Sequence, residues 1–143
     1  MIAIILAIVS GAAMSVQGVL NTRLNERIGL WEATTIVQGI AFVLSLITMF
    51  LIGKGNLREL ASVNKFYLLG GVLGVIITFT VIKTVSGLGP TYGIATILVS
   101  QLVVAAIIDA FGLFGTPKLT FSLNEFLGAG IMIAGIILFK WKF

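Results

Sequence analysis

The sequence predicts an all-α integral membrane protein whose five transmembrane helices form a single domain over residues 1–143. Two observations carry this prediction. First, 59% of the residues are hydrophobic and only 10% are charged, whereas globular domains carry about 25% charged residues. Second, the apolar residues come in blocks of about 20, the length that a helix needs to cross a hydrocarbon core about 30 Å thick. The mean hydropathy of +1.19 agrees with both.

Helices rather than a β-barrel account for these blocks. A helix satisfies every backbone N–H and C=O group within lipid. A transmembrane strand would show polar and apolar residues alternating over about ten positions. The blocks show no such alternation.

The polar interruptions predict where each helix begins and ends. We expect helices over residues 2–22, 31–52, 66–85, 90–111 and 124–139. The polar stretch 21–32 is expected to end the first helix. Residues 66–111 would be roughly 69 Å long as one helix, so the chain has to break within them. Gly87, Gly89 and Pro90 predict the position of the break, because glycine ends a helix and proline begins the next one.

Five crossings place the termini on opposite sides of the membrane. The lysines and arginines are distributed almost evenly between the two sides, so they predict no clear orientation. One side holds Lys54, Arg58, Lys65 and Lys118, and the other holds Arg23, Arg27, Lys83, Lys140 and Lys142. A difference of one charge is too small for the positive-inside rule to predict which side faces the cytoplasm. Three interpretations stay open. The chain inserts both ways and pairs antiparallel with itself, another feature fixes one orientation, or a related chain supplies the opposite half.

Composition also excludes several classes of function. The chain has no Cys and no His, which excludes thiol catalysis and thiolate metal sites and removes the commonest general base. We therefore expect no metal and no cofactor. The net charge of +4 comes from isolated cations without a basic cluster, so no nucleic-acid partner is expected. The N-terminus has no basic region before its apolar block and is interpreted as a first transmembrane helix, not as a removable signal.

Polar side chains within the first helix are candidates for contact with a solute. Ser10, Met14, Gln17 and Asn21 recur at i, i+4, i+7 and i+11, on one stripe of the helix. Gly11 and Gly18 flank the stripe and allow close approach. Because polar groups are costly in lipid, the stripe is either the wall of a substrate cavity or a set of interhelical hydrogen bonds, each worth about 0.6 kcal/mol.

Two further glutamines raise the same alternative. Gln38 lies in the second helix, where a structural hydrogen bond is the slightly favoured interpretation. Gln101 lies near the middle of the fourth helix. Transporters bind their cargo near the membrane midplane, so Gln101 is a candidate for the same cavity.

Asp109 is the one acidic residue placed inside a predicted helix beyond its first turn, where Glu32 and Glu125 lie. It lies toward the C-terminal end, where the helix dipole does not stabilise a carboxylate. Either it couples transport to a proton or cation, or it forms a structural ion pair with Lys65 or Arg58. Lys83 lies near a helix end and is interpreted as an anchor that reaches the headgroups.

Small residues on two helices predict close helix packing. They are Gly70, Gly71 and Gly74 on the third helix, and Gly128, Gly130, Ala134 and Gly135 on the fifth. Such small-xxx-small patterns let two helix backbones approach each other. For the fifth helix we favour packing or dimerisation over ligand contact.

An ordered set of these residues resembles the YdcZ-like inner-membrane exporters, short bacterial members of the drug/metabolite transporter superfamily. In chain order the set is Gln17-x-x-x-Asn21-x-x-Leu24, Gly70-Gly71-x-x-Gly74, Gln101-Leu102-Val103, Asp109-x-Phe111-Gly112 and Leu127-Gly128-Ala129. Two positions depart from the family pattern, Ser100 in place of glycine and Ala110 in place of histidine. The second departure weakens a proton relay beside Asp109.

The resemblance implies that the chain is one five-helix half of a ten-helix transporter of inverted topology, in the bacterial inner membrane. It also implies export of small molecules. The small multidrug exporters of the superfamily use a glutamate in their first helix to export cations. The first helix here carries Gln17 and Asn21 instead, which favours a neutral or anionic cargo.

The sequence thus predicts a secondary transporter that exports a small polar metabolite or drug-like molecule as an antiparallel dimer. Gln17, Asn21, Gln38 and Gln101 would line its cavity and Asp109 would couple it to a gradient, since no ATP-binding motif is present. One alternative is a non-transporting scaffold or assembly subunit with a fixed orientation. An intramembrane enzyme is disfavoured, because acid–base catalysis usually needs a second group beside Asp109.

Overall fold

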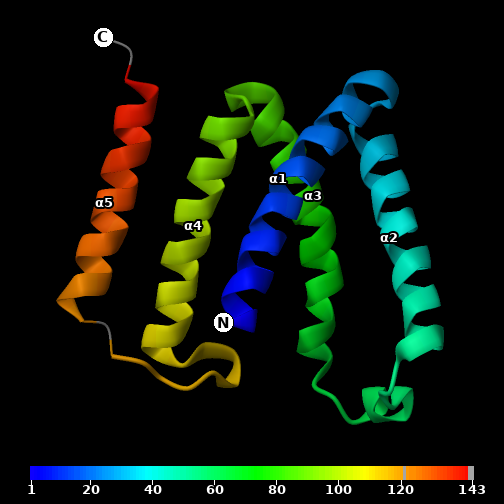
Figure 1. Ribbon diagram of the computed structural model, residues 1–143. Helices are drawn as coiled ribbons and strands as arrows, with labels where there is room; N and C mark the ends of the chain where they lie inside the picture. Colours follow the sequence, from blue (N-terminus) through cyan, green and yellow to red (C-terminus); the bar gives the residue numbers. More distant parts are fainter. Residues whose placement is uncertain (121, 142–143) are drawn as a thin grey trace. The chain divides into compact units, whose positions relative to one another are not determined.

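The computed structural model describes residues 1–120 and 122–141 (Figure 1). In this part of the chain, five helices are long and apolar enough to cross a membrane. They are α1 (Ile2–Ile28), α2 (Leu30–Ile52), α3 (Leu69–Leu88), α4 (Pro90–Phe111) and α5 (Leu123–Lys140). Short 3₁₀ helices η1 (Leu57–Ala61), η2 (Lys65–Leu68) and η3 (Leu113–Gly115) lie in the connections, and the described residues contain no strand. The predicted all-α class with five helices able to cross a membrane is confirmed, whereas the single domain and the ten-helix arrangement stay predictions.

The first helix is longer than predicted. We expected it to end at Thr22, but α1 continues through the charged residues to Ile28 and is 27 residues long. Arginine, leucine and glutamate are good helix formers, so polarity alone does not stop a helix. Arg23 Nη1 also lies 3.0 Å from Glu26 Oε2 on the helix surface. The helix ends at Gly29, whose φ of 99° is accessible to glycine at little cost.

The remaining boundaries lie close to the predicted ones, with one change of helix type. The helix expected from Phe66 starts as the 3₁₀ helix η2 and becomes α-helical at Leu69. The break between α3 and α4 is confirmed. Gly89 has a φ of 79°, and Pro90 is the first residue of α4. Proline suits this place, because the first residues of a helix have no intrahelical acceptor for their N–H groups.

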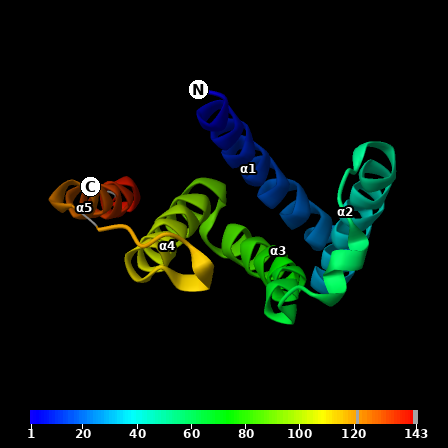
Figure 2. The same ribbon diagram turned by 90° about the horizontal axis from the view of Figure 1, so that it is seen from below.

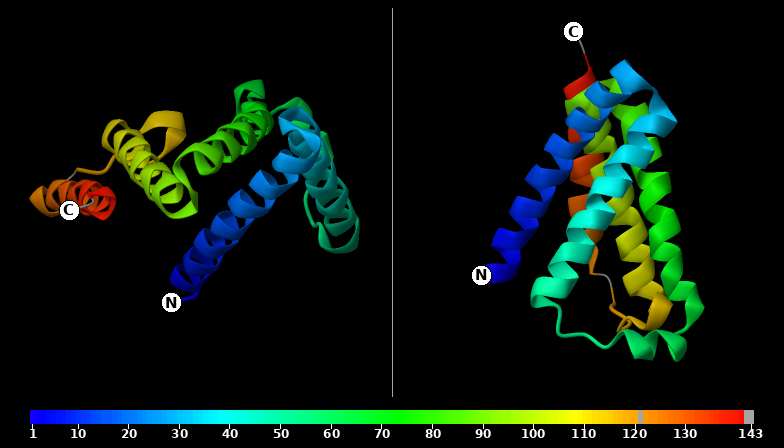
Figure 3. Two further views of the ribbon diagram at one scale, coloured as in Figure 1. Left: turned by 90° about the horizontal axis from the view of Figure 1, so that it is seen from above. Right: turned by 90° about the vertical axis from the view of Figure 1, so that its right-hand side faces the viewer.

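The chain folds as two compact units that divide between Ser86 and Gly87. In the first unit, α1 and α2 diverge from their junction at Gly29 (Figures 2 and 3). The core of this unit lies toward the junction and includes Ala33, Ile82 and Val85. Gly18 lets α1 approach α3, since a Cβ atom placed there would lie 3.2 Å from Val81 Cγ1.

Two aromatic side chains also join α2 to α3. The rings of Trp31 in α2 and Phe79 in α3 stack with centroids 5.1 Å apart. Away from the junction the helices expose apolar side chains, among them Ile8 and Phe42. An apolar surface of this kind suits lipid, which is as apolar as leucine.

In the second unit, α4 and α5 pack side by side (Figure 1). At one end Lys140 Nζ lies 4.7 Å from the centre of the Tyr92 ring, a cation–π contact worth about 1 kcal/mol. At the other end the Leu119 N–H donates to the Asp109 carbonyl oxygen at 2.9 Å. This bond fastens the connecting segment to the last turn of α4.

Only some of the predicted close-packing glycines have neighbours. Gly18 contacts α3, and a Cβ atom at Gly74 would lie 3.4 Å from Gln38 Nε2. A Cβ atom at the other predicted positions, Gly11, Gly70, Gly71, Gly128, Gly130 and Gly135, would meet no atom within 4 Å. These positions are therefore open, each within its own unit.

Candidate functional site

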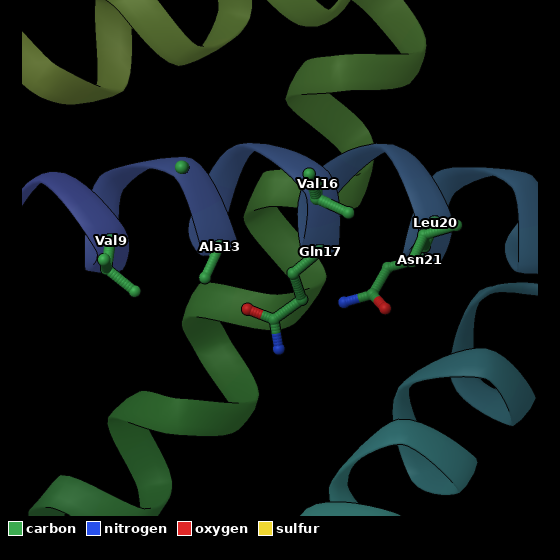
Figure 4. Close-up of a pocket in the computed structure, with 7 residues that line it drawn as sticks. Val9, Ala13, Val16, Gln17, Leu20 and Asn21 are labelled. Atoms are coloured by element: carbon green, nitrogen blue, oxygen red, sulfur yellow. The ribbon is translucent and has the colours of Figure 1, made fainter.

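A shallow, open depression of about 580 Å³, which we call the α1 cavity, lies along one face of α1 (Figure 4). Its lining residues all belong to α1, and two of them are polar, Gln17 and Asn21. Their amides lie one helical turn apart on the same side of the helix (Figure 4). Each amide offers a hydrogen-bond donor and an acceptor, so the pair can bind a neutral polar group in either role.

Asn21 combines deep burial with an unpaired amide. The residue is 7% exposed. Its side chain has no hydrogen-bond partner among residues 1–120 and 122–141. In this part of the chain, every side-chain nitrogen or oxygen atom that is completely buried does have a hydrogen-bond partner. The Asn21 amide is therefore not sealed in the core but retains access to the cavity that it lines. A polar group held this way in a membrane helix is costly unless water or a solute binds it.

The rest of the cavity wall is apolar and was not foreseen. Its members are Val9, Ala12, Ala13, Val16 and Leu20. Ser10 and Met14, expected on the same stripe as the amides, are exposed and do not belong to this wall. The small side chains Ala12 and Ala13, five and four residues before Gln17, were the signal available in the sequence.

Gln38 is engaged within the first unit. Its Nε2 donates to Thr78 Oγ1 at 3.3 Å, and Thr78 in turn donates to the Gly74 carbonyl oxygen at 3.0 Å. This chain of bonds joins α2 to α3. Thr78 was not singled out from the sequence, because which residue faces Gln38 depends on the register of two helices.

Gln101 lies in the middle of α4 and is exposed. The α4 side chains that face α5 include Leu102, Val103 and Ala106. With 3.6 residues per turn, Gln101 points to roughly the opposite side of α4 from these residues. No hydrogen bond of its side chain is found in the described part of the chain.

Asp109 is half-buried in the last turn of α4. Its backbone carbonyl holds Leu119, while its carboxylate forms no ion pair among the described residues of the second unit. Lys65 and Arg58, the suggested partners, belong to the first unit, so this pairing stays a prediction. Lys142, counted above with the anchoring cations, lies outside the described residues.

Five helices long and apolar enough to cross a membrane define a multi-pass membrane protein, and two amides of its first helix line a largely apolar cavity. A family model described as "Putative inner membrane exporter, YdcZ" matches residues 2–138, nearly the whole chain. The chain belongs to this family, which is one of transporters and not of enzymes, and it is a multi-pass protein of the inner membrane. Comparisons with curated proteins and with solved structures gave no match.

Proposed function

We propose that the protein is a secondary transporter that exports a small polar solute through a cavity containing Gln17 and Asn21. One observation carries the proposal: Asn21 is 7% exposed, and its unpaired amide opens on a cavity of about 580 Å³. A purely structural amide would be expected to find a partner, as Gln38 does with Thr78. The cavity lining holds no charged side chain, which favours a neutral cargo.

The cavity wall on α1 is one side of a site. Because its lining residues all come from α1, the first unit supplies one wall, and we propose that a second copy of the chain supplies the opposite one. Gln101 suits this role, since an exposed amide in mid-helix is costly against lipid. We propose that Gln101 of a second, antiparallel copy of the chain completes the site. Rocking of the two halves would then expose the cavity to each side in turn.

Gln38 and Asp109 take different parts in this proposal. Gln38 joins α2 to α3, because its amide nitrogen donates to Thr78. That nitrogen is thus not available to the cargo, and Gln38 contributes to the shape of the site. Asp109 is the acidic group available within α4, and we propose that it couples export to a proton or cation gradient. Like the dimer, these roles are proposals.

Single cysteines test the cavity, because the chain has none of its own. We would place one at Gln17, Asn21 or Gln101, and a lipid-facing control at Ile8, which is 67% exposed. A water-soluble maleimide should label the first three from both sides of the membrane and leave the control unlabelled. Three positions that resist the reagent as the control does would contradict an aqueous cavity and favour a scaffold.

Transport itself is tested without knowing the cargo. Proteoliposomes would be loaded with a ¹³C-labelled extract of small bacterial metabolites, and the outer solution analysed by mass spectrometry. Wild type should release a narrow set of neutral polar compounds, and Asn21→Leu should release much less of them. Equal release by wild type, Asn21→Leu and empty liposomes would overturn the proposal.

A further inference from the structure

The second unit contains a cavity that the transport site does not use. It lies between α4, α5 and the segment that joins them, and its volume is about 760 Å³. This volume is in the range of about 300–1,000 Å³ typical of small-molecule sites. Leu102, Ile107 and Phe111 of α4 and Phe126 and Met132 of α5 make its walls largely apolar.

The cavity has the length of one membrane leaflet. Its α4 wall runs from Leu102 to Phe111, which is about 14 Å along a helix. Half of a hydrocarbon core about 30 Å thick is about 15 Å. The end near Phe111 adjoins the segment that leaves the last turn of α4, so the apolar walls run from the interface inward.

Two opposite charges line the cavity at this interfacial end, Lys118 and Glu125. Among the described residues they form no ion pair with each other. The Glu125 carboxylate accepts hydrogen bonds from the backbone and hydroxyl of Ser122, which fix it in the first turn of α5. Lys118 packs against Gly112, where an added Cβ atom would lie 3.4 Å from Lys118 Cβ. The adjacent hydrogen bond from the Leu119 N–H to the Asp109 carbonyl oxygen also fixes the backbone beside Lys118.

We propose that this cavity binds a membrane phospholipid with a zwitterionic headgroup. One acyl chain lies along the apolar walls, the phosphate binds Lys118, and the headgroup ammonium binds Glu125. The argument is charge complementarity, since this headgroup carries both opposite charges close together at the interface. An anionic lipid would satisfy Lys118 but would place its negative charge beside Glu125 with no counter-charge.

Two glycines of α5 provide a matched test of the cavity. Gly128 lines it and Gly130 does not, and a Cβ atom at either would meet no atom within 4 Å. Purified full-length protein in detergent would be incubated with phosphatidylethanolamine, and bound lipid counted by native mass spectrometry. Gly128→Leu should fill the cavity and reduce lipid binding about tenfold. Gly130→Leu should bind as wild type does, and equal binding by both variants would overturn the site.

The headgroup is tested by competition between phosphatidylethanolamine and phosphatidylglycerol. Wild type should retain the zwitterionic lipid in preference. Glu125→Gln keeps the capping arrangement at Ser122, because glutamine also serves in a capping box. This variant should lose the preference for the zwitterionic lipid, while Lys118→Gln should weaken binding of both lipids. A wild-type preference for phosphatidylglycerol, or an unchanged preference in Glu125→Gln, would refute the assignment.

Discussion

At the scale of single residues, Gln38 and Asn21 show how alike two amides look in a sequence and how differently they are placed. Gln38 donates to Thr78 at 3.3 Å, whereas Asn21, at 7% exposure, has no partner in the described part of the chain. The sequence left both open between packing and binding. Whether an amide packs or binds depends on which side chains the fold places beside it, and those side chains are far away in the sequence, as Thr78 is from Gln38.

The two amides therefore predict opposite effects on stability. Gln38→Leu should lower the free energy of unfolding in detergent by about 0.6 kcal/mol, the usual value of one interhelical hydrogen bond. Asn21→Leu keeps the number of side-chain heavy atoms and breaks no hydrogen bond among the described residues, so it should lower stability less or raise it. Thermal unfolding of the two purified variants measures the difference. A larger loss for Asn21→Leu would show that its amide is structural.

At the scale of helices, glycines set both the packing and the breaks. A Cβ atom at Gly18 would lie 3.2 Å from Val81 Cγ1 of α3, while one at Gly11, two turns earlier on α1, would meet no atom within 4 Å. Gly18→Leu should overpack the contact with Val81 and cost about 1–3 kcal/mol. Gly11→Leu is the matched control and should leave the melting temperature unchanged. Equal melting temperatures for the two variants would contradict the contact between α1 and α3.

The break between α3 and α4 predicts a second matched pair. Gly89 has a φ of 79°, whereas Gly87 lies within α3 with open space at its Cβ position. Gly89→Ala should cost about 1 kcal/mol of stability because alanine avoids positive φ. Gly87→Ala should be neutral or slightly stabilising, since alanine is the better helix former. Thermal unfolding distinguishes them, and the reverse order would argue against the break.

The helix boundaries also show what the sequence could and could not predict. Gly89 and Pro90 were sufficient to place the α3–α4 break, because their backbone preferences are local. Arg23, Glu26 and Arg27 did not indicate where α1 ends, since charged residues can mark the end of the membrane-embedded part while the helix itself continues. The apolar cavity wall at Ala12 and Ala13 was missed, because small apolar residues look the same against lipid, another helix or a cavity.

At the scale of the whole molecule, orientation in the membrane is the central question. The two sides carry four and five cations by sequence, so the charge balance is nearly even. We expect a cysteine at Gly55, and separately one placed after Phe143, to be labelled in about half of the molecules by an impermeant maleimide in intact cells. Full labelling of one site and none of the other would contradict the antiparallel homodimer.

Charge balance can then be shifted deliberately. Four lysines added beside Gly55 should fix one orientation, and removal of Arg58 and Lys65 should fix the other, since each change leaves a difference of about three cations between the two sides. Each variant alone should lose transport, and the two together should recover it. Transport by either variant alone would mean that copies of like orientation suffice.

The junction at Gly29 bears on how such a chain enters the membrane during synthesis. A single residue separates α1 from α2. The first two helices can thus insert together as a hairpin, and the polar material that must cross with its tip is confined to the short stretch 21–32, in which two arginines and two glutamates balance each other. The cost of translocation is then small in either direction. A chain built this way meets no large kinetic barrier that would commit it to one orientation before the later helices emerge.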